Sequence, residues 1–229
     1  INNPYDSPNT DGIDPESCSN IHISNCHVDV GDDCIAIKAG TEGTAERVPC
    51  KNITITNCTM VHGHGGVVIG SEMSGSVENV TISNCVFTNT DRGIRLKSRR
   101  YRGGAVQDIR VDNVIMENVL CPFIANLYYM WGPRGMDPDV VDKNPAPVTK
   151  DTPVFRRLHF SNMTCKDVNA SAGHFFGLAE MYVEDCTFEN VYISIADNAI
   201  EGEPAMYVGV QPVKEKGFVL TNTRGIKFN

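Results

Sequence analysis

The chain has 229 residues, of which 41% are hydrophobic, and a formal net charge of −8 at pH 7. This length and apolar content allow one globular domain with a sizeable core. The acidic balance argues against a nucleic-acid partner, because no global positive field exists to attract phosphates. The apolar runs are too short to cross a bilayer and no signal peptide opens the chain, so we expect no membrane partner.

A seven-residue segment recurs along the chain. Asn-Ile-His-Ile-Ser-Asn-Cys at 20–26 returns in similar form at 52–58 and 79–85, weaker copies follow at 108–114 and 157–163, and the first four copies start 32, 27 and 29 residues apart. Apolar and polar residues alternate within each copy, which predicts a strand, and the Asn near its end favours the left-handed backbone of a tight bend. One strand per period and no helical pattern between copies predict an all-β fold, a parallel β-solenoid.

The spacing also predicts a second stacked strand in each turn. Counted from the terminal Cys of each copy, two sets of apolar residues fall at constant distances. Nine residues on lie Ile35, Val67 and Ile94, and eleven on lie Ile37, Ile69 and Leu96. Because these positions share one count, we expect the three segments to stack in register.

The same count places polar residues in one groove. Asp32, His64 and Asp91 fall six residues after the Cys in consecutive turns. Neighbouring strands lie about 4.8 Å apart, so Asp32 and His64 should be close neighbours on one outer surface. Arg95 and Lys97 flank an inward-facing leucine, so both should point outward into the same groove.

Arg95 and Lys97 belong to a basic cluster in an otherwise acidic chain. The cluster comprises Arg95, Lys97, Arg99, Arg100 and Arg102. Because two members share a strand face with the groove, we favour an anion-binding patch over a solvated run of charge.

The nine cysteines do not form a recognisable metal or disulfide pattern. Cys26, Cys58 and Cys85 occupy equivalent repeat positions, where a small apolar side chain inside the coil is favoured over a disulfide. No Cys-x-x-Cys pair exists and the histidines lack zinc-like spacing, so we predict no metal and no cofactor. The redox compartment stays open.

Both ends of the chain read as interrupted repeats. The chain opens at Ile1 without an initiator Met, and Gly225–Asn229 reads like another copy beginning. We therefore expect residues 1–229 to form a single parallel β-helix domain, a fragment lacking terminal coils, whose exposed edges favour a homo-oligomer. Residues 131–153 are rich in Pro, Asp and Gly, which predicts a surface loop.

Four short motifs carry the chemistry. They are Asn9-Thr10-Asp11, Gly31-Asp32-Asp33, Gly63-His64-Gly65 and Arg95-Leu96-Lys97. Each motif alone is weak, but carboxylates, an imidazole and two cations on one face are what hydrolysis of an acidic glycoside needs. One carboxylic acid protonates the departing oxygen, while a carboxylate deprotonates water or attacks directly. Crowding raises the pKa of one carboxyl, and the cations would hold the carboxylates of the substrate.

This ordered set resembles the polygalacturonase family, glycoside hydrolase family 28. The flanking segments Asp14–Ser17, Gly70–Gly75 and Arg102–Gly104 are also similar to that family, and Leu96 replaces its usual Ile. The resemblance implies a right-handed parallel β-helix that hydrolyses α-1,4-galacturonosyl linkages of pectin or polygalacturonate.

The resemblance also implies catalytic roles. It makes Asp32 the general acid and has Asp11 and Asp33 together activate water, with inversion at the anomeric carbon. His64 would tune or orient Asp32. Inversion implies about 6.5 to 9.5 Å between acid and base, to admit the water.

Substrate-binding residues follow from the same resemblance. Arg95 and Lys97 would bind the galacturonate carboxylate beside the scissile bond, and Asn9 would lie in the substrate cleft. The family also uses a cleft tyrosine, for which Tyr129 or Tyr128 is the candidate.

Residues near the motifs have plainer interpretations. Lys38 follows the Cys of its repeat at the same distance as Lys97 does, so the two should face the same side. Lys38 therefore either meets another sugar carboxylate or is a surface lysine. Asp14 reads as a structural turn residue before a proline, and His62 as a loop-stabilising one.

Alternatives of three kinds stay open: a rhamnogalacturonan or other pectic hydrolase, a calcium-dependent pectate lyase, and a catalytically inert carbohydrate-binding fragment. The expected partner is a pectic polysaccharide or oligogalacturonide. Pectin is extracellular, so we expect a secreted or cell-envelope protein, with the cytoplasm as the alternative for a bacterial oligogalacturonide hydrolase.

Overall fold

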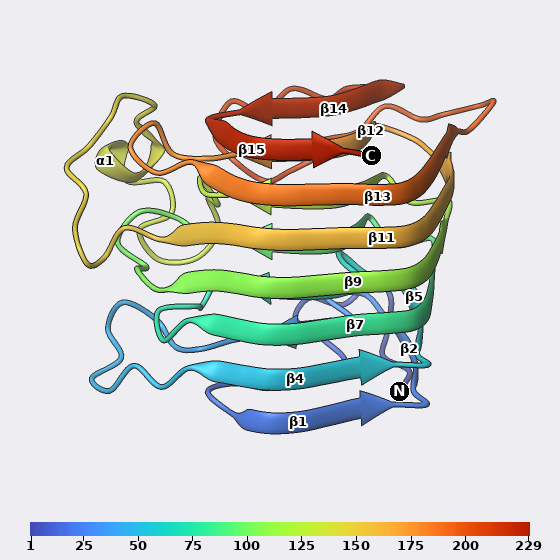
Figure 1. Ribbon diagram of the computed structural model, residues 1–229, viewed down its shortest axis with the longest axis horizontal. Coiled ribbons are helices and arrows are strands. Elements are labelled where there is room, and N and C mark those ends of the chain that lie inside the picture. The colour runs from blue at the N-terminus through green and yellow to red at the C-terminus, as the bar shows by residue number, and fades with distance from the viewer.

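The computed structural model describes residues 1–229, and its strands stack as rungs along one axis (Figure 1). A nine-stranded parallel sheet forms one face. Its strands are β1 (Ser19–Ser24), β2 (His27–Val30), β4 (Cys50–Thr56), β5 (Thr59–His62), β7 (Val77–Thr88), β9 (Ala105–Glu117), β11 (Val154–Val168), β13 (Val183–Ile195) and β15 (Thr223–Phe228).

A six-stranded parallel sheet forms the opposite face. Its strands are β3 (Ile35–Ile37), β6 (Val67–Gly70), β8 (Arg92–Lys97), β10 (Cys121–Asn126), β12 (Ser171–Phe176) and β14 (Lys216–Thr221). Successive turns of the chain add one strand each to this sheet, in the order β3, β6, β8, β10, β12, β14. The predicted parallel β-helix is confirmed.

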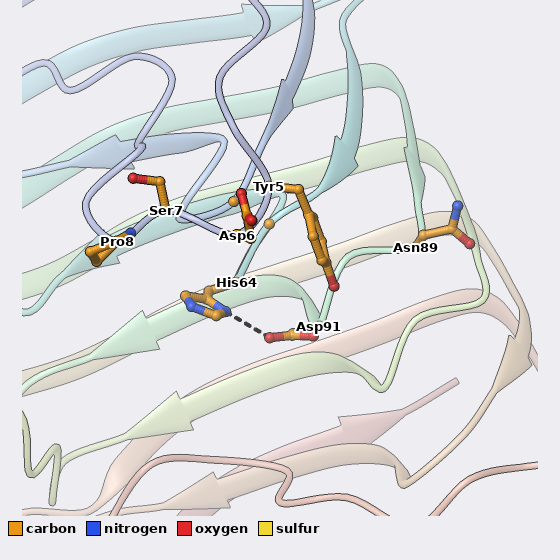
Figure 2. A pocket seen from close by; sticks show the side chains of 9 residues that line it. Tyr5, Asp6, Ser7, Pro8, His64, Asn89 and Asp91 are labelled. Carbon is orange, nitrogen blue, oxygen red and sulfur yellow. Dashed lines mark hydrogen bonds and ion pairs between the residues drawn. The ribbon is translucent and has the colours of Figure 1, made fainter.

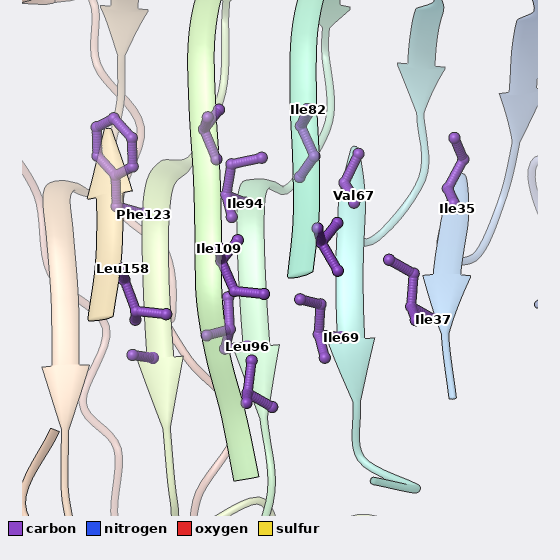
Figure 3. Packing of buried hydrophobic residues seen from close by; sticks show 14 of the residues in the cluster. Ile35, Ile37, Val67, Ile69, Ile82, Ile94, Leu96, Ile109, Phe123 and Leu158 are labelled. Atoms are coloured by element: carbon purple, nitrogen blue, oxygen red, sulfur yellow. The ribbon is translucent and has the colours of Figure 1, made fainter. Parts of the chain in front are cut away.

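The predicted register of the second sheet is confirmed residue by residue. Ile35 pairs with Val67, which pairs with Ile94, and Ile37 and Ile69 continue the adjacent stack to Leu96. These side chains point into the core between the sheets (Figure 3). Packing of these alternate Ile, Val and Leu side chains in the core fixes the register, because a slip of one residue would turn the set away from the core.

The seven-residue copies are the rungs of the first sheet. Ile53 pairs with Val80, and Val80 with Ile109, which in turn pairs with Leu158 of the 157–163 copy. Residues 225–228 belong to β15, as their sequence indicated. One rung, β13, was not predicted; its segment Asp185-Cys186-Thr187 has Cys where the other copies have Ile, Val or Leu.

Asparagines turn the corners of the coil. Asn25, Asn57 and Asn84 have φ values of 58°, 54° and 55°, the left-handed region that asparagine tolerates better than most residues. Their side chains form a ladder between coils. The Asn57 amide donates to Asn25 Oδ1 at 2.6 Å, and that of Asn113 to Asn84 Oδ1 at 2.8 Å. These bonds satisfy polar groups at bends, where backbone pairing is interrupted.

The cysteines behave as core residues. Cys58 and Cys85 are buried and Cys26, on the first rung, is partly exposed. All nine thiols are free. The prediction of an interior role for this repeat position is confirmed, and burial raises the pKa of Cys85 to about 11, which keeps the thiol protonated.

Residues 127–153 connect β10 to β11 and carry the only helix, α1 (Pro138–Val141), which lies beside the stack of strands, to the left of β11 and β13 in Figure 1. This helix was not predicted. No helix in the structure is long and apolar enough to span a bilayer.

Candidate active site

A groove of about 720 Å³ contains the nominated residues of all four motifs, together with Lys38 and Tyr129. It is lined by Pro8, Asn9, Asp11, Glu16, Asp32, Asp33, Lys38, His64, Ser71, Glu72, Arg95, Lys97, Tyr129, Trp131, Gly132 and Met206. The spacing argument therefore located the groove correctly.

The strand pairing explains why these side chains converge. Leu96 packs inward, so Arg95 and Lys97 on either side of it face outward, and their rung partners are Val68 and Gly70. Gly63 is needed at the neighbouring turn, because a Cβ there would lie 2.3 Å from the Asp32 carbonyl oxygen and φ is +74°. That close approach allows the His64 N–H to donate to the Asp32 carbonyl at 3.2 Å.

Asp33 is held as a buried carboxylate. Only 1% of its surface is exposed. Burial alone would raise its pKa, but Lys97 and Arg95 outweigh that effect and hold the pKa of Asp33 below its usual value. Arg95 Nη1 lies 3.0 Å from one carboxylate oxygen and Lys97 Nζ 2.7 Å from the other. Both cations are therefore engaged by Asp33 itself.

Asp11 has the opposite tendency. Burial, followed by repulsion from Asp14 and Asp32, raises its pKa to about 6. Lys38 moderates the rise, since its Nζ lies 3.5 Å from Asp11 Oδ2 and also pairs with Asp14. Lys38 is thus a salt-bridged lysine in the groove wall, with Asp14 and Asp11 as its partners.

The expected separation of the carboxyl groups is wrong. Oxygens of Asp11, Asp32 and Asp33 all lie within 4.8 Å of one another, less than the range expected for inversion. The register gives the reason. Asp32 and Asp33 are consecutive, and the Gly12 N–H bonds to the Asp33 carbonyl at 3.0 Å, so Asp11 lies one rung away.

His64 lies beside these carboxyls but bonds to a different residue. Its Nδ1 is 2.7 Å from Asp91 Oδ2 (Figure 2). This hydrogen bond, rather than contact with Asp32, is the main reason that the pKa of His64 is raised. Asp91 occupies the same repeat position as Asp32 and His64. The spacing therefore placed Asp91 in the groove region but assigned no role to it. A second cavity, of about 390 Å³, lies where Tyr5, Asp6 and Ser7 approach His64 (Figure 2).

Of the two candidate tyrosines, Tyr129 lies in the groove. Its ring centroid is 5.1 Å from Lys97 Nζ and 5.8 Å from Arg95 Cζ, which is cation–π geometry. Tyr128 is buried against Phe176 and does not line the groove.

Three members of the basic cluster do not bind at the groove, contrary to the wider patch that we favoured. Arg99 and Arg102 pair with Glu42, and Arg100 pairs with Glu180. All three are buried, so they are not a solvated run either. The alternation of strand faces predicts the direction of a side chain only within a strand. Because β8 ends at residue 97, this rule applied to Arg95 and Lys97 but not to the three later arginines.

Several groove residues had no signal in the sequence. Trp131 and Met206 come from segments without a repeat, and Met206 Sδ lies 2.7 Å from Arg95 Nη2. Glu16 and Ser71 stand beside recognised motifs but share no count with the site residues. Composition alone therefore does not define the groove wall.

The oxygens of the aspartate triad are donors of the type that Ca²⁺ or Mg²⁺ prefers. Both Asp33 oxygens, however, already bond to cationic side chains. The triad is thus neutralised in part by the protein's own Arg95 and Lys97.

Fold and groove together define a parallel β-helix that presents clustered carboxyls and paired cations on one outer face. The sequence model of glycosyl hydrolases family 28 matches residues 1–193. The chain belongs to this family, and the resemblance drawn from the motifs is confirmed.

Known proteins of similar sequence and structure carry related names. The chain is 36% identical over 172 residues to a probable polygalacturonase of Vitis vinifera, covering 74% of this chain and 33% of the relative. It is 39% identical over 152 residues to an endo-polygalacturonase of Pectobacterium parmentieri, covering 66% and 36% respectively. The crystal structure of a Thermotoga maritima exopolygalacturonase superposes with a TM-score of 0.72 at 31% identity, covering 93% of this chain and 48% of the other. The chain thus spans about a third of the length of these curated relatives.

Proposed function

We propose that this protein hydrolyses α-1,4-galacturonosyl linkages of pectin or polygalacturonate. The observation that carries the proposal is the meeting of Asp11, Asp32 and Asp33 with Arg95 and Lys97 in one groove. The polygalacturonase names of the relatives support the same substrate class.

The protonation states suit acid–base hydrolysis. Asp33 stays ionised beside its two cations, while the raised pKa of Asp11 keeps a proton within the triad at mildly acidic pH. In the proposed assignment Asp32 protonates the departing oxygen, and Asp33 with ionised Asp11 activates water. His64, fixed by Asp91, orients or tunes Asp32.

Substrate binding in this proposal uses the cations and Tyr129. A galacturonate carboxylate would share Arg95 and Lys97 with Asp33, which both attracts the anion and limits how tightly it binds. Asn9 and Lys38 line the same groove and would contact neighbouring sugars.

We propose inversion at the anomeric carbon. A carboxyl gap within 4.8 Å is nearer to the spacing of retaining enzymes, about 5 to 5.5 Å, than to the spacing of inverting ones. Asp33, however, is a poor nucleophile because both of its oxygens bond to cations. Proton NMR of the first products decides the point: inversion gives the β-anomer first, and the α-anomer first would assign retention.

Replacing Asp32 tests the proposed activity. Asp32→Asn should abolish release of reducing ends from polygalacturonate while the far-ultraviolet spectrum and melting temperature stay unchanged. Asp197→Asn, an exposed carboxylate outside the groove, is the matched control and should cleave normally. Equal cleavage by Asp32→Asn and wild type would refute the assignment, and unsaturated products absorbing in the ultraviolet would indicate a lyase instead.

Because the substrate is an extracellular polymer, we propose a secreted or cell-envelope location. Fractionation of the source cells tests it.

A further inference from the structure

Trp131 is the feature of the groove that the proposed chemistry leaves unused. It is the only tryptophan in the chain, and it lines the groove with half of its surface, 50%, exposed. An aromatic ring exposed in the wall of a groove offers a flat apolar surface on which the ring of a ligand can pack.

The neighbouring contacts show why Trp131 differs from Tyr129. The Tyr129 ring already lies against Arg95 and Lys97, and the backbone N–H of Tyr129 donates to the Ser98 carbonyl oxygen at 2.9 Å. Trp131 follows two residues later and lines the same groove, where it forms no such cation–π pair. It therefore offers an uncharged flat surface beside the charged part of the groove.

A galacturonate ring presents complementary chemistry. Its carboxylate needs a cation, but in the galacto configuration the C–H groups at C3, C4 and C5 form a continuous apolar face. Such a face packs well against an aromatic ring, whereas a ring with an equatorial O4 has a more interrupted one.

We propose that Trp131 is a substrate-positioning residue that stacks on the apolar face of a galacto-configured sugar next to the one bound by Arg95 and Lys97. This inference rests on the proposed function and adds a second contact site for the same polymer. It makes the protein prefer oligomers long enough to reach both sites over a single sugar.

The single tryptophan makes the proposal directly measurable. Titrating trigalacturonate into Asp32→Asn protein should give a saturable shift of tryptophan emission, because stacking changes the solvent exposure of Trp131. Galacturonate monomer should give a much smaller shift at equal concentration. Unchanged emission while calorimetry shows trigalacturonate binding would overturn the proposal.

Kinetics provide the second measurement. Trp131→Ala should raise KM for trigalacturonate about tenfold with kcat nearly unchanged, and Trp131→Phe should restore most of the loss. The matched control is Tyr192→Ala, an exposed aromatic on β13 that does not line the groove, which should leave KM unchanged. An unaltered KM in Trp131→Ala would overturn the proposal.

The two measurements separate this inference from the proposed function. Cleavage without an emission shift refutes stacking and leaves the hydrolase proposal standing. A saturable shift without cleavage supports stacking and refutes hydrolysis.

Discussion

Asp11 and Asp33 lie one rung apart and have opposite shifts in pKa. The difference comes from their partners. Asp33 bonds to two cations inside the protein, while Asp11 is half-desolvated beside Asp14 and Asp32 with a single, shared lysine. The arrangement of charge around chemically identical side chains therefore gives neighbouring carboxyls in one groove different affinities for the proton.

The charge state of Asp11 makes stability depend on pH. Its folded pKa, about 6, exceeds its ordinary value of 3.8, so the folded state binds the proton more tightly between these values. Stability therefore falls as pH rises from about 4 to 6, and the ionised side chain destabilises the fold above that. Asp11→Asn should raise the unfolding free energy at pH 7 by about 1 to 2 kcal/mol, since the side chain is only partly exposed, and by almost nothing at pH 4.

Urea unfolding of both proteins at the two pH values measures this difference. The same Asp197→Asn control should show no change at either pH. A gain at pH 4 as large as that at pH 7 would contradict the assigned pKa shift.

At the scale of single elements, the repeat determined what could be predicted. Register was predictable because each rung repeats the same alternation, and that register placed Asp32, His64, Arg95 and Lys97 together. Ion pairs between side chains near the strands and side chains in the loops were not predictable. The partners of Arg99, Arg100 and Arg102 are glutamates in segments without period, so no count from the repeat leads to them. The salt bridges of Lys38 to Asp11 and Asp14 were not predicted for a related reason, since the count gives the direction of a side chain but not its carboxylate partner.

Arg100 anchors the connection that carries α1. Its guanidinium donates to the carbonyl oxygens of Asp139, Asp142 and Asn144 and pairs with Glu180, and both charged side chains are 4% exposed. This cation therefore replaces the strand pairing that residues 139–144 lack.

Removing the Arg100 charge should release that connection. Arg100→Met leaves Glu180 buried without a partner and should lower the unfolding free energy by about 3 to 5 kcal/mol, with faster amide exchange across residues 139–144. Adding Glu180→Leu should recover part of the stability, because no unpaired charge remains, but not the slow exchange. Unchanged exchange in Arg100→Met would show that other contacts hold the connection.

Across the whole molecule, the composition of the core changes along the coil axis. The early coils are filled by stacks of Ile and Val (Figure 3). The later coils carry an aromatic cluster that joins the two sheets. Phe188 is at its centre, with ring centroids of Phe160 and Phe218 each 4.8 Å away and that of Phe228 at 5.0 Å. The groove, in contrast, is built mainly on the earlier coils.

This separation predicts that two equally buried phenylalanines have different effects on function. Phe188→Ala and Phe87→Ala should each lower the unfolding free energy by about 3 to 5 kcal/mol, because each leaves a cavity in the core.

In a solenoid each coil contacts only its neighbours, so damage at Phe188 should raise amide exchange first in β13 to β15 and leave cleavage at low temperature nearly intact. Phe87 packs against Gly66, two residues after His64, so its loss should reduce cleavage as well. Hydrogen exchange and reducing-end assays on both variants measure this, and equal losses of cleavage would mean that the coils respond as one cooperative unit.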